Sequence, residues 1–170
     1  PTHECSSAAS DVYKRQGGYG GKEIKDLKSY WLPIKTFIGV TKPIGNELQS
    51  VLKKPLGFSD NRRAGNYYRV LPGNRLSWGR GISAVGKFTS LSLKRAISKE
   101  INYFFPELRN VEIDYVWFGN MAYASHYMPY VGSIKIGNEE KNVFTLMGFG
   151  GHGMNTACLL YTSPSPRDDR

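Results

Sequence analysis

Cysteine and histidine are scarce in this sequence. Its 170 residues include two cysteines and three histidines. Both cysteines, Cys5 and Cys158, and one histidine, His3, lie in or beside terminal segments that differ from the interior. An interior without cysteine does not support a disulfide framework, a zinc site or a thiol nucleophile. We therefore predict no metal site.

Long apolar runs are also absent. No run approaches the about 20 residues that a membrane-spanning helix needs, and no charged-then-apolar signal peptide opens the chain. Hydrophobic residues make up 40% and charged residues 22% of the sequence, which is ordinary for a globular protein. The sequence therefore predicts a soluble, cytoplasmic domain that can bury a core and has no membrane partner.

Negative charge is in deficit. Lysine and arginine outnumber aspartate and glutamate by 23 to 14, and the formal net charge is +9. This balance favours acidic partners, which include nucleic acid, anionic lipid and small phosphorylated or carboxylated ligands. Five arginines are interleaved with aromatic residues, a pattern that would suit single-stranded nucleic acid. They are Arg62, Arg63, Arg69, Arg75 and Arg80. Because scattered charges are typical of a solvated surface, this basic β-rich binding module is the less favoured alternative.

The two ends of the chain differ from the interior. Residues 1–16 show neither a helical nor a strand period, and the run 158–170 interrupts a helix that has just begun. Both segments resemble translated adaptor or linker sequence. We therefore leave them out of the fold and interpret residues 17–157 as the native part.

Hydrophobic spacing predicts the elements between the ends. The predicted helices are 46–53 and 90–105, and the predicted strands are 34–41, 66–71, 75–79, 112–119, 133–136 and 143–147. Gly79, Gly81 and Gly86 predict a loop, and 137–138 predict a turn. The strand at 112–119 is apolar on both faces in its second half, so we expect it at the centre of the sheet. Together these elements predict an α+β fold, a mostly antiparallel mixed sheet with helices on one face.

A glycine-rich segment follows the last predicted strand. Four glycines occur in the six residues 148–153, which predicts a strand, a tight turn and the start of a helix. Glycine lets the backbone approach a ligand closely, and the N–H groups of a helix start can hold a phosphate, a carboxylate or the electron-rich edge of a ring. A turn that binds no ligand is the alternative interpretation.

Three segments in order, 66–79, 115–132 and 148–154, resemble one family. They are similar to the C-terminal half of FAD-dependent oxidoreductases of the D-amino acid oxidase superfamily, in particular to bacterial gamma-glutamylputrescine oxidases. The resemblance implies the substrate domain of a two-domain flavoprotein, plus the last strand and helix start of a Rossmann-like FAD domain. It further implies that the glycine turn meets the pyrimidine end of the flavin, where helix N–H groups stabilise negative charge. The cofactor-binding residues would be Gly150, Gly151, His152, Gly153 and Met154.

The same resemblance implies substrate contacts from the hairpin and from the segment after the strand at 112–119. By position these would be Tyr67, Tyr68, Arg80, Tyr123 and His126. Tyr67 and Tyr68 alternate along a strand, so at least one should lie in the core, and His126 could serve only its own loop. No arginine occurs in 124–127, where many carboxylate-binding relatives have one. This favours an amine over an amino acid as the substrate.

The implied activity is oxidation of a C–N bond in an amine or amino acid by hydride transfer to FAD. The sequence nominates no catalytic acid or base. No Gly-x-Gly-x-x-Gly fingerprint, the motif that holds the FAD pyrophosphate, follows the first predicted strand. We therefore interpret the chain as a fragment whose missing partner is the N-terminal FAD domain of the same protein, and expect the isolated chain to be inactive.

Overall fold

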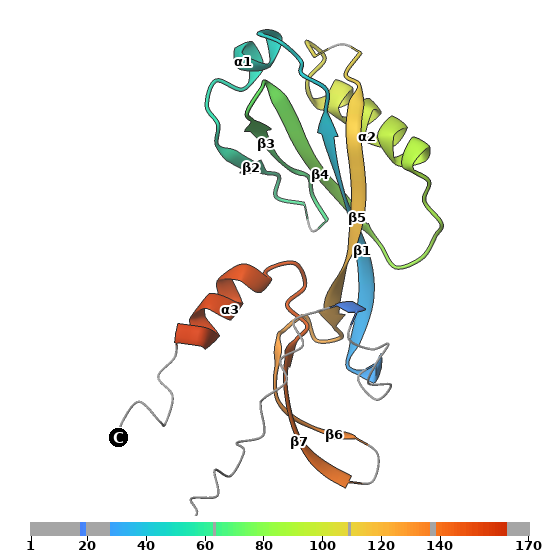
Figure 1. Ribbon diagram of the computed structural model, residues 1–170, viewed down its shortest axis with the longest axis vertical. Coiled ribbons are helices and arrows are strands. Elements are labelled where there is room, and N and C mark those ends of the chain that lie inside the picture. The colour runs from blue at the N-terminus through green and yellow to red at the C-terminus, as the bar shows by residue number, and fades with distance from the viewer. Residues whose placement is uncertain (1–17, 20–27, 63, 109, 137–138, 163–170) are drawn as a thin grey trace, which may run out of the picture.

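A computed structural model describes residues 18–19, 28–62, 64–108, 110–136 and 139–162 (Figure 1). The strands are β1 (Trp31–Thr41), β2 (Gly57–Ser59), β3 (Tyr67–Leu71), β4 (Arg75–Ser83), β5 (Ile113–Ala124), β6 (Tyr130–Ile136) and β7 (Glu139–Met147). The helices are α1 (Glu47–Val51), α2 (Ser90–Phe104) and α3 (Gly153–Thr162). One sheet has the order β2-β3-β4-β1-β5, and β6 and β7 form a second sheet. All the strand pairs are antiparallel, which confirms the predicted α+β fold.

Helix α2 packs against one face of the five-stranded sheet (Figure 1). It begins with a capping box between Thr89 and Ser92, and it buries Leu93, Ile97 and Ile101. This stripe meets Trp78 and other residues of β4, together with residues of α1, in the main core. The sequence predicted this helix to within one residue because its apolar period and its cap coincide. We call the sheet face opposite α2 the open face.

Strand β5 lies at the edge of the sheet, so the prediction of a central strand was wrong. Its side chains alternate: Val116 packs against the core under α2, whereas Tyr115 and Trp117 lie on the open face and are 59% and 48% exposed. Phe118 is also half exposed. The composition of an aromatic run does not tell whether its strand lies at the centre or at the edge of a sheet. Only the strand order distinguishes the two cases.

Strand β4 continues through part of the predicted glycine loop. It pairs with β1 as far as Ser83, so Gly81 belongs to a strand and the loop prediction was wrong there. Gly79, which the sequence placed where the predicted strand 75–79 meets the loop, also lies within the strand. The register shifts between Thr36 and Phe37, which places a bulge in the pair. Glycine in a strand often marks such a bulge or a close approach by another group. Gly86 does lie in the connection to α2.

The β6–β7 hairpin and α3 follow β5 at the lower end of the molecule (Figure 1). The strands predicted at 133–136 and 143–147 lie within β6 and β7, while the turn predicted at 137–138 falls outside the described residues. Helix α3 continues past Ala157 to Thr162, so the interruption expected from Cys158 onward does not occur there. None of the helices in the described ranges is long and apolar enough to cross a membrane.

Candidate functional site

The glycine turn before α3 is bonded to the lower end of β5. Gly148, Gly150 and Gly151 have φ values of 78°, 57° and 90°, a region in which residues with a side chain are strained. The N–H of Gly150 donates to the carbonyl oxygen of Ala122 at 2.9 Å. Phe149 forms a bridge with Tyr123. Backbone bonds thus fix the turn against one strand.

Side chains of β5 lie close to this turn, so a larger residue in it would have to push them aside. A Cβ atom at Gly150 would lie 3.1 Å from Cε1 of Tyr123, and one at Gly151 would lie 3.1 Å from Sδ of Met121. A Cβ at Gly148 would lie 3.0 Å from that of Ala124. Glycine is therefore needed here for the backbone conformation and also for the close approach.

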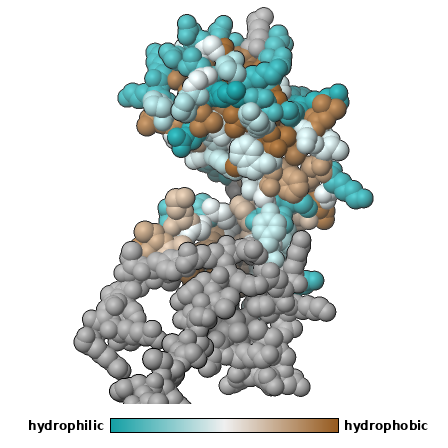
Figure 2. Space-filling model, viewed as in Figure 1, coloured by the Kyte–Doolittle hydropathy of each residue, from teal (hydrophilic) through white to brown (hydrophobic). Residues whose placement is uncertain are grey.

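Helix α3 begins directly after the turn. The first N–H groups of a helix have no acceptor within the helix, so those of α3 point back toward the turn. The N–H of His152 donates to the carbonyl oxygen of Phe149 at 3.0 Å, and the side chains of His152 and Met154 are exposed. Figure 2 shows apolar surface on α3, where Met154 is 87% exposed. The five residues predicted to bind the cofactor are consecutive in the chain, and Gly151, His152 and Met154 among them are exposed. A helix start with narrow glycine backbone fits the electron-rich edge of a flat ring.

The open face carries a row of residues across four strands. Tyr67 pairs with Gly79, Gly79 pairs with Ile38, and Ile38 pairs with Trp117. Directly paired residues of an antiparallel sheet project from the same face. Tyr67 and Trp117 are each about half exposed, and no member of this row carries a charge. The row offers an aromatic, neutral surface that continues along β5 toward Tyr123 and the glycine turn.

Two of the predicted substrate residues lie on the opposite face. The ring of Tyr68 stacks on Trp78 with centroids 4.6 Å apart, and burial raises the pKa of the Tyr68 hydroxyl. Arg80 forms an ion pair with Glu100 of α2, with Nε and Oε2 2.9 Å apart. The structure therefore separates Tyr68 and Arg80 from Tyr67, and the expectation that one of the two tyrosines is a core residue is confirmed.

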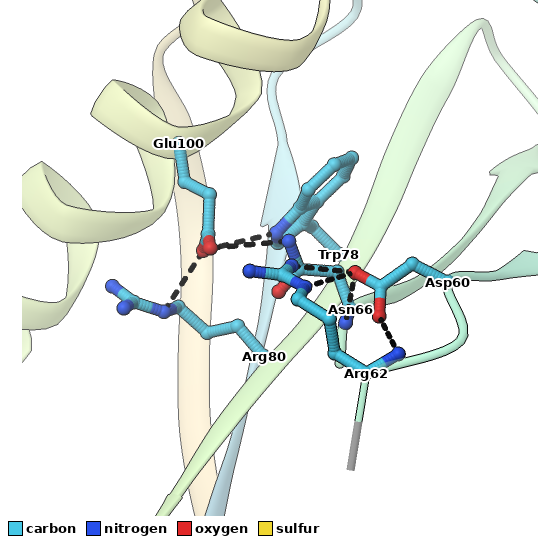
Figure 3. A network of polar contacts seen from close by, with 6 residues as sticks. All are labelled: Asp60, Arg62, Asn66, Trp78, Arg80 and Glu100. Carbon is cyan, nitrogen blue, oxygen red and sulfur yellow. Dashed lines mark hydrogen bonds and ion pairs between the residues drawn. The ribbon is translucent and has the colours of Figure 1, made fainter. Parts of the chain in front are cut away.

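Glu100 joins both strands of the hairpin to α2 (Figure 3). Besides Arg80, its carboxylate accepts hydrogen bonds from Nδ2 of Asn66 at 3.1 Å and from Nε1 of Trp78 at 3.4 Å. Asn66 directly precedes Tyr67, and Trp78 directly precedes Gly79. From the covered side of the sheet, Glu100 thus fixes the neighbours of Tyr67 and Gly79, the two members of the open-face row that belong to the hairpin.

Asp60 holds the loop that leads into β3 (Figure 3). It accepts hydrogen bonds from the backbone N–H groups of Arg62 and Asn66, and it pairs with the Arg62 guanidinium. These bonds, chiefly that from the Arg62 side chain, lower the pKa of Asp60 from 3.8 to about 2. The loop is therefore held in one conformation by a single carboxylate.

Tyr123 and His126 have different surroundings. Tyr123 contacts the glycine turn and also lines a pocket of about 360 Å³ with Trp31, Leu32 and Ile34. His126 is exposed, and its Nδ1 accepts a hydrogen bond from the N–H of Met128 at 3.2 Å. Tyr123 is therefore adjacent to the residues predicted to bind the cofactor, whereas His126 serves its own loop.

Thr36, Gly79 and Trp117 belong to the open face but were not nominated from the sequence. The signal was present in the alternation of β5, in which Tyr115 and Trp117 fall on one face and Val116 on the other. Thr36 and Gly79 gave no such signal, because their place depends on the register of three strands.

The family model described as FAD dependent oxidoreductase matches residues 16–160. The chain belongs to this family. Within the family, it is 28% identical over 141 residues to gamma-glutamylputrescine oxidoreductase of Escherichia coli K12. It is 29% identical over 124 residues to the probable oxidoreductase OrdL of Haemophilus influenzae. These matches confirm the family resemblance that the three sequence segments indicated.

The matches cover 82% and 72% of this chain but 32% and 26% of the two relatives, so the chain spans about a third or less of their length. Among solved structures, L-proline dehydrogenase from P. horikoshii has a TM-score of 0.58 at 20% identity, over 78% of this chain and 34% of that one. Glycine oxidase from Geobacillus kaustophilus has a TM-score of 0.55 at 18% identity, over 88% and 41%. The family's fold is therefore present in this chain.

Proposed function

We propose that this chain is the substrate-binding part of a flavin-dependent enzyme that oxidises a C–N bond of an amine. The observation that carries the proposal is the docking of the glycine turn and the start of α3 onto β5, beside an exposed aromatic sheet face. A bound FAD would supply the two-electron oxidation, and the imine product would then react with water. The family membership and the relative described as gamma-glutamylputrescine oxidoreductase support this proposal.

The residues proposed to hold the flavin ring are Gly150, Gly151, His152, Gly153 and Met154. Their backbone N–H groups at the positive end of the α3 dipole would stabilise negative charge on the edge of the reduced ring. Two of them, Gly150 and Gly151, touch β5 so closely that a side chain at either position would displace the turn. We propose that the pyrophosphate and adenosine are held by another part of the parent protein, because no Gly-x-Gly-x-x-Gly follows the first strand; this spacing occurs at 148–153, after β7.

The proposed substrate surface consists of Tyr67 and Tyr123, with Trp117 added from the structure. Support for an amine over an amino acid comes from two arginines of the hairpin that already have carboxylate partners: Arg75 pairs with Asp114, and Arg80 pairs with Glu100. The third, Arg69, is exposed on the open face two residues from Tyr67. A neutral aromatic surface suits an amine that must lose its proton before it can deliver a hydride. Tyr68, Arg80 and His126 are left out of this site.

We further propose that residues 17–157 are the native part and that the chain needs an FAD domain of the same protein for activity. The coverage of the relatives and the lack of such a fingerprint after the first strand support this. The alternative, binding of single-stranded nucleic acid, loses support because Arg62, Arg75 and Arg80 are engaged in ion pairs. The cytoplasmic location stays a prediction.

The test is to sequence the source DNA on both sides of codons 17–157, then to express the complete reading frame. The proposal expects an upstream strand followed by Gly-x-Gly-x-x-Gly, a visible flavin spectrum in the purified protein, and flavin reduction by amines. A complete protein that binds no flavin would refute the cofactor assignment. A flavoprotein reduced by amino acids and not by amines would refute the substrate class.

A further inference from the structure

The ring of Tyr67 lies flat across the neighbouring strand. Tyr67 belongs to β3, and its pairing partner on β4 is Gly79. A Cβ atom at Gly79 would lie 2.0 Å from Cε2 and 2.1 Å from Cζ of the Tyr67 ring, where no side chain can be accommodated. The ring therefore occupies the space that any other residue at position 79 would fill.

The far end of this ring reaches a third strand. The Tyr67 hydroxyl lies 3.3 Å from Oγ1 of Thr36, a residue of β1. Tyr67 thus extends from β3 over β4 to β1, with one ring face against the sheet and the other toward solvent. Its ring is 42% exposed despite these contacts. A flat, partly exposed ring with a fixed hydroxyl pair is a suitable surface for a ligand that has a carbon chain and a polar atom.

We infer that Gly79 and Thr36 are positioning residues that hold Tyr67 flat on the open face, so that its ring and hydroxyl contact the substrate amine. This inference rests on the proposed function. The ring face covers the carbon atoms next to the amino group, and the hydroxyl oxygens of Tyr67 and Thr36 accept hydrogen bonds from its N–H groups. Trp117 lies in the same row, three strands from Tyr67, and bounds this surface on the side of β5.

The hydroxyl pair can accept hydrogen bonds from the N–H groups of an amine. It carries no positive charge with which to hold a carboxylate. Arg80 is on the covered side with Glu100, whereas Arg69, two residues from Tyr67 along β3, is exposed on the open face. The Tyr67–Thr36 pair is thus an uncharged polar position, with Arg69 as the neighbouring cation on β3.

The first experiment replaces Gly79 in the complete flavoenzyme. Gly79→Ala places a methyl group where the ring lies. It should lower kcat/KM for the amine about tenfold, mainly by raising KM, because the displaced ring takes away a contact surface and one or two hydrogen bonds. Gly57→Ala is the matched control, because it adds a methyl group to the same sheet at a position with nothing within 4 Å. Equal kcat/KM in Gly79→Ala and Gly57→Ala, with unchanged flavin content, would overturn the inference.

A double-mutant cycle separates positioning from general damage. If Gly79 acts through Tyr67, adding Gly79→Ala to Tyr67→Ala should change kcat/KM by less than about twofold. A further tenfold loss in that background would show that position 79 acts in another way. Thr36→Val, which keeps the shape and removes the hydroxyl, should raise KM about three- to tenfold, and Thr36→Ser should restore it.

These outcomes are distinguishable from a failure of the proposed function. If the complete protein binds no flavin or oxidises no amine, the enzyme assignment fails and the kinetic comparison does not arise. A crystal structure of the Gly79→Ala variant then tests the positioning alone, since the inference requires the Tyr67 ring to leave its place over β4. A ring that stays in place with alanine at position 79 would refute it.

Discussion

Replacing Glu100 by alanine tests whether the covered side of the hairpin is held by one carboxylate. Glu100 accepts from Asn66, Trp78 and Arg80, and its side chain is 18% exposed. Asn66 and Trp78 are both buried, so neither donor can turn to bulk water without a change in the fold. The variant therefore removes the acceptor and leaves two buried donors behind.

The size of the effect follows from those two donors. A buried donor without an acceptor costs about 1–3 kcal/mol. The Trp78 bond is long at 3.4 Å, so we take the lower part of that range and expect about 2–3 kcal/mol for the two donors together. The pair with Arg80, which is a third exposed, adds less than about 1 kcal/mol after solvent screening.

Urea unfolding of the purified protein, followed by tryptophan fluorescence, measures this loss. The matched control is Glu112→Ala, which removes a carboxylate from an exposed ion pair with Lys42 and should leave the free energy of unfolding nearly unchanged. If Glu100→Ala and Glu112→Ala were equally stable, Glu100 would not be the acceptor on which the hairpin depends. Glu100→Gln, which keeps one acceptor oxygen, should fall between the parent and the alanine variant.

Three further predictions concern single positions. Trp117→Ala should change the free energy of unfolding by less than about 1 kcal/mol because this residue is half exposed. Trp78→Ala should cost about 3–5 kcal/mol because Trp78 is fully buried. Equal losses in urea unfolding would contradict the placement of the two residues on opposite faces. Gly151→Ala should release flavin from the complete enzyme, whereas Gly73→Ala, with φ of 75° and open space around it, should retain it, as flavin content after gel filtration will show. Asp60→Asn should flatten the acid side of the stability profile. Because the pKa of Asp60 is lowered, its carboxylate adds stability above the ordinary pKa of 3.8, and this contribution is lost as the pH falls through about 2. Equal slopes of unfolding free energy against pH for the parent and the variant would count against the Asp60 contacts.

The sequence predicted the elements whose local signals agree. The apolar stripe of α2 repeats every three or four residues, and Pro106 follows the helix, so its period and its end were readable from the sequence, whereas the residue that caps its start is Thr89. The glycine turn was also predicted, because only glycine suits the positive φ values found at Gly148, Gly150 and Gly151. In both cases the deciding interactions lie within a few residues of one another along the chain.

Predictions that depended on strand order or register were less successful. The aromatic run of β5 was assigned to the sheet centre because hydrophobicity does not report whether a strand has one neighbour or two. Gly79 was placed at the end of a predicted strand, where a glycine loop was expected to begin. In the structure it lies within β4 and is paired with Tyr67, and its missing side chain makes room for the ring. Arg80 was nominated as a substrate residue from its place in a motif, while the alternation of β4 turns it toward Glu100.

The hairpin of β3 and β4 therefore separates two roles by residue parity. Tyr68, Trp78 and Arg80 project to the covered side, where each has a stacking or hydrogen-bonding partner within the fold. Tyr67 and Gly79 face the other way, where one ring covers three strands and half of it stays accessible. Substitutions at even positions should thus appear first in the free energy of unfolding, and substitutions at odd positions first in KM. Because neighbouring residues differ in this way, single substitutions at positions 66–68 and 78–80, each measured for stability and for KM, separate residues of the proposed site from residues that only stabilise the fold.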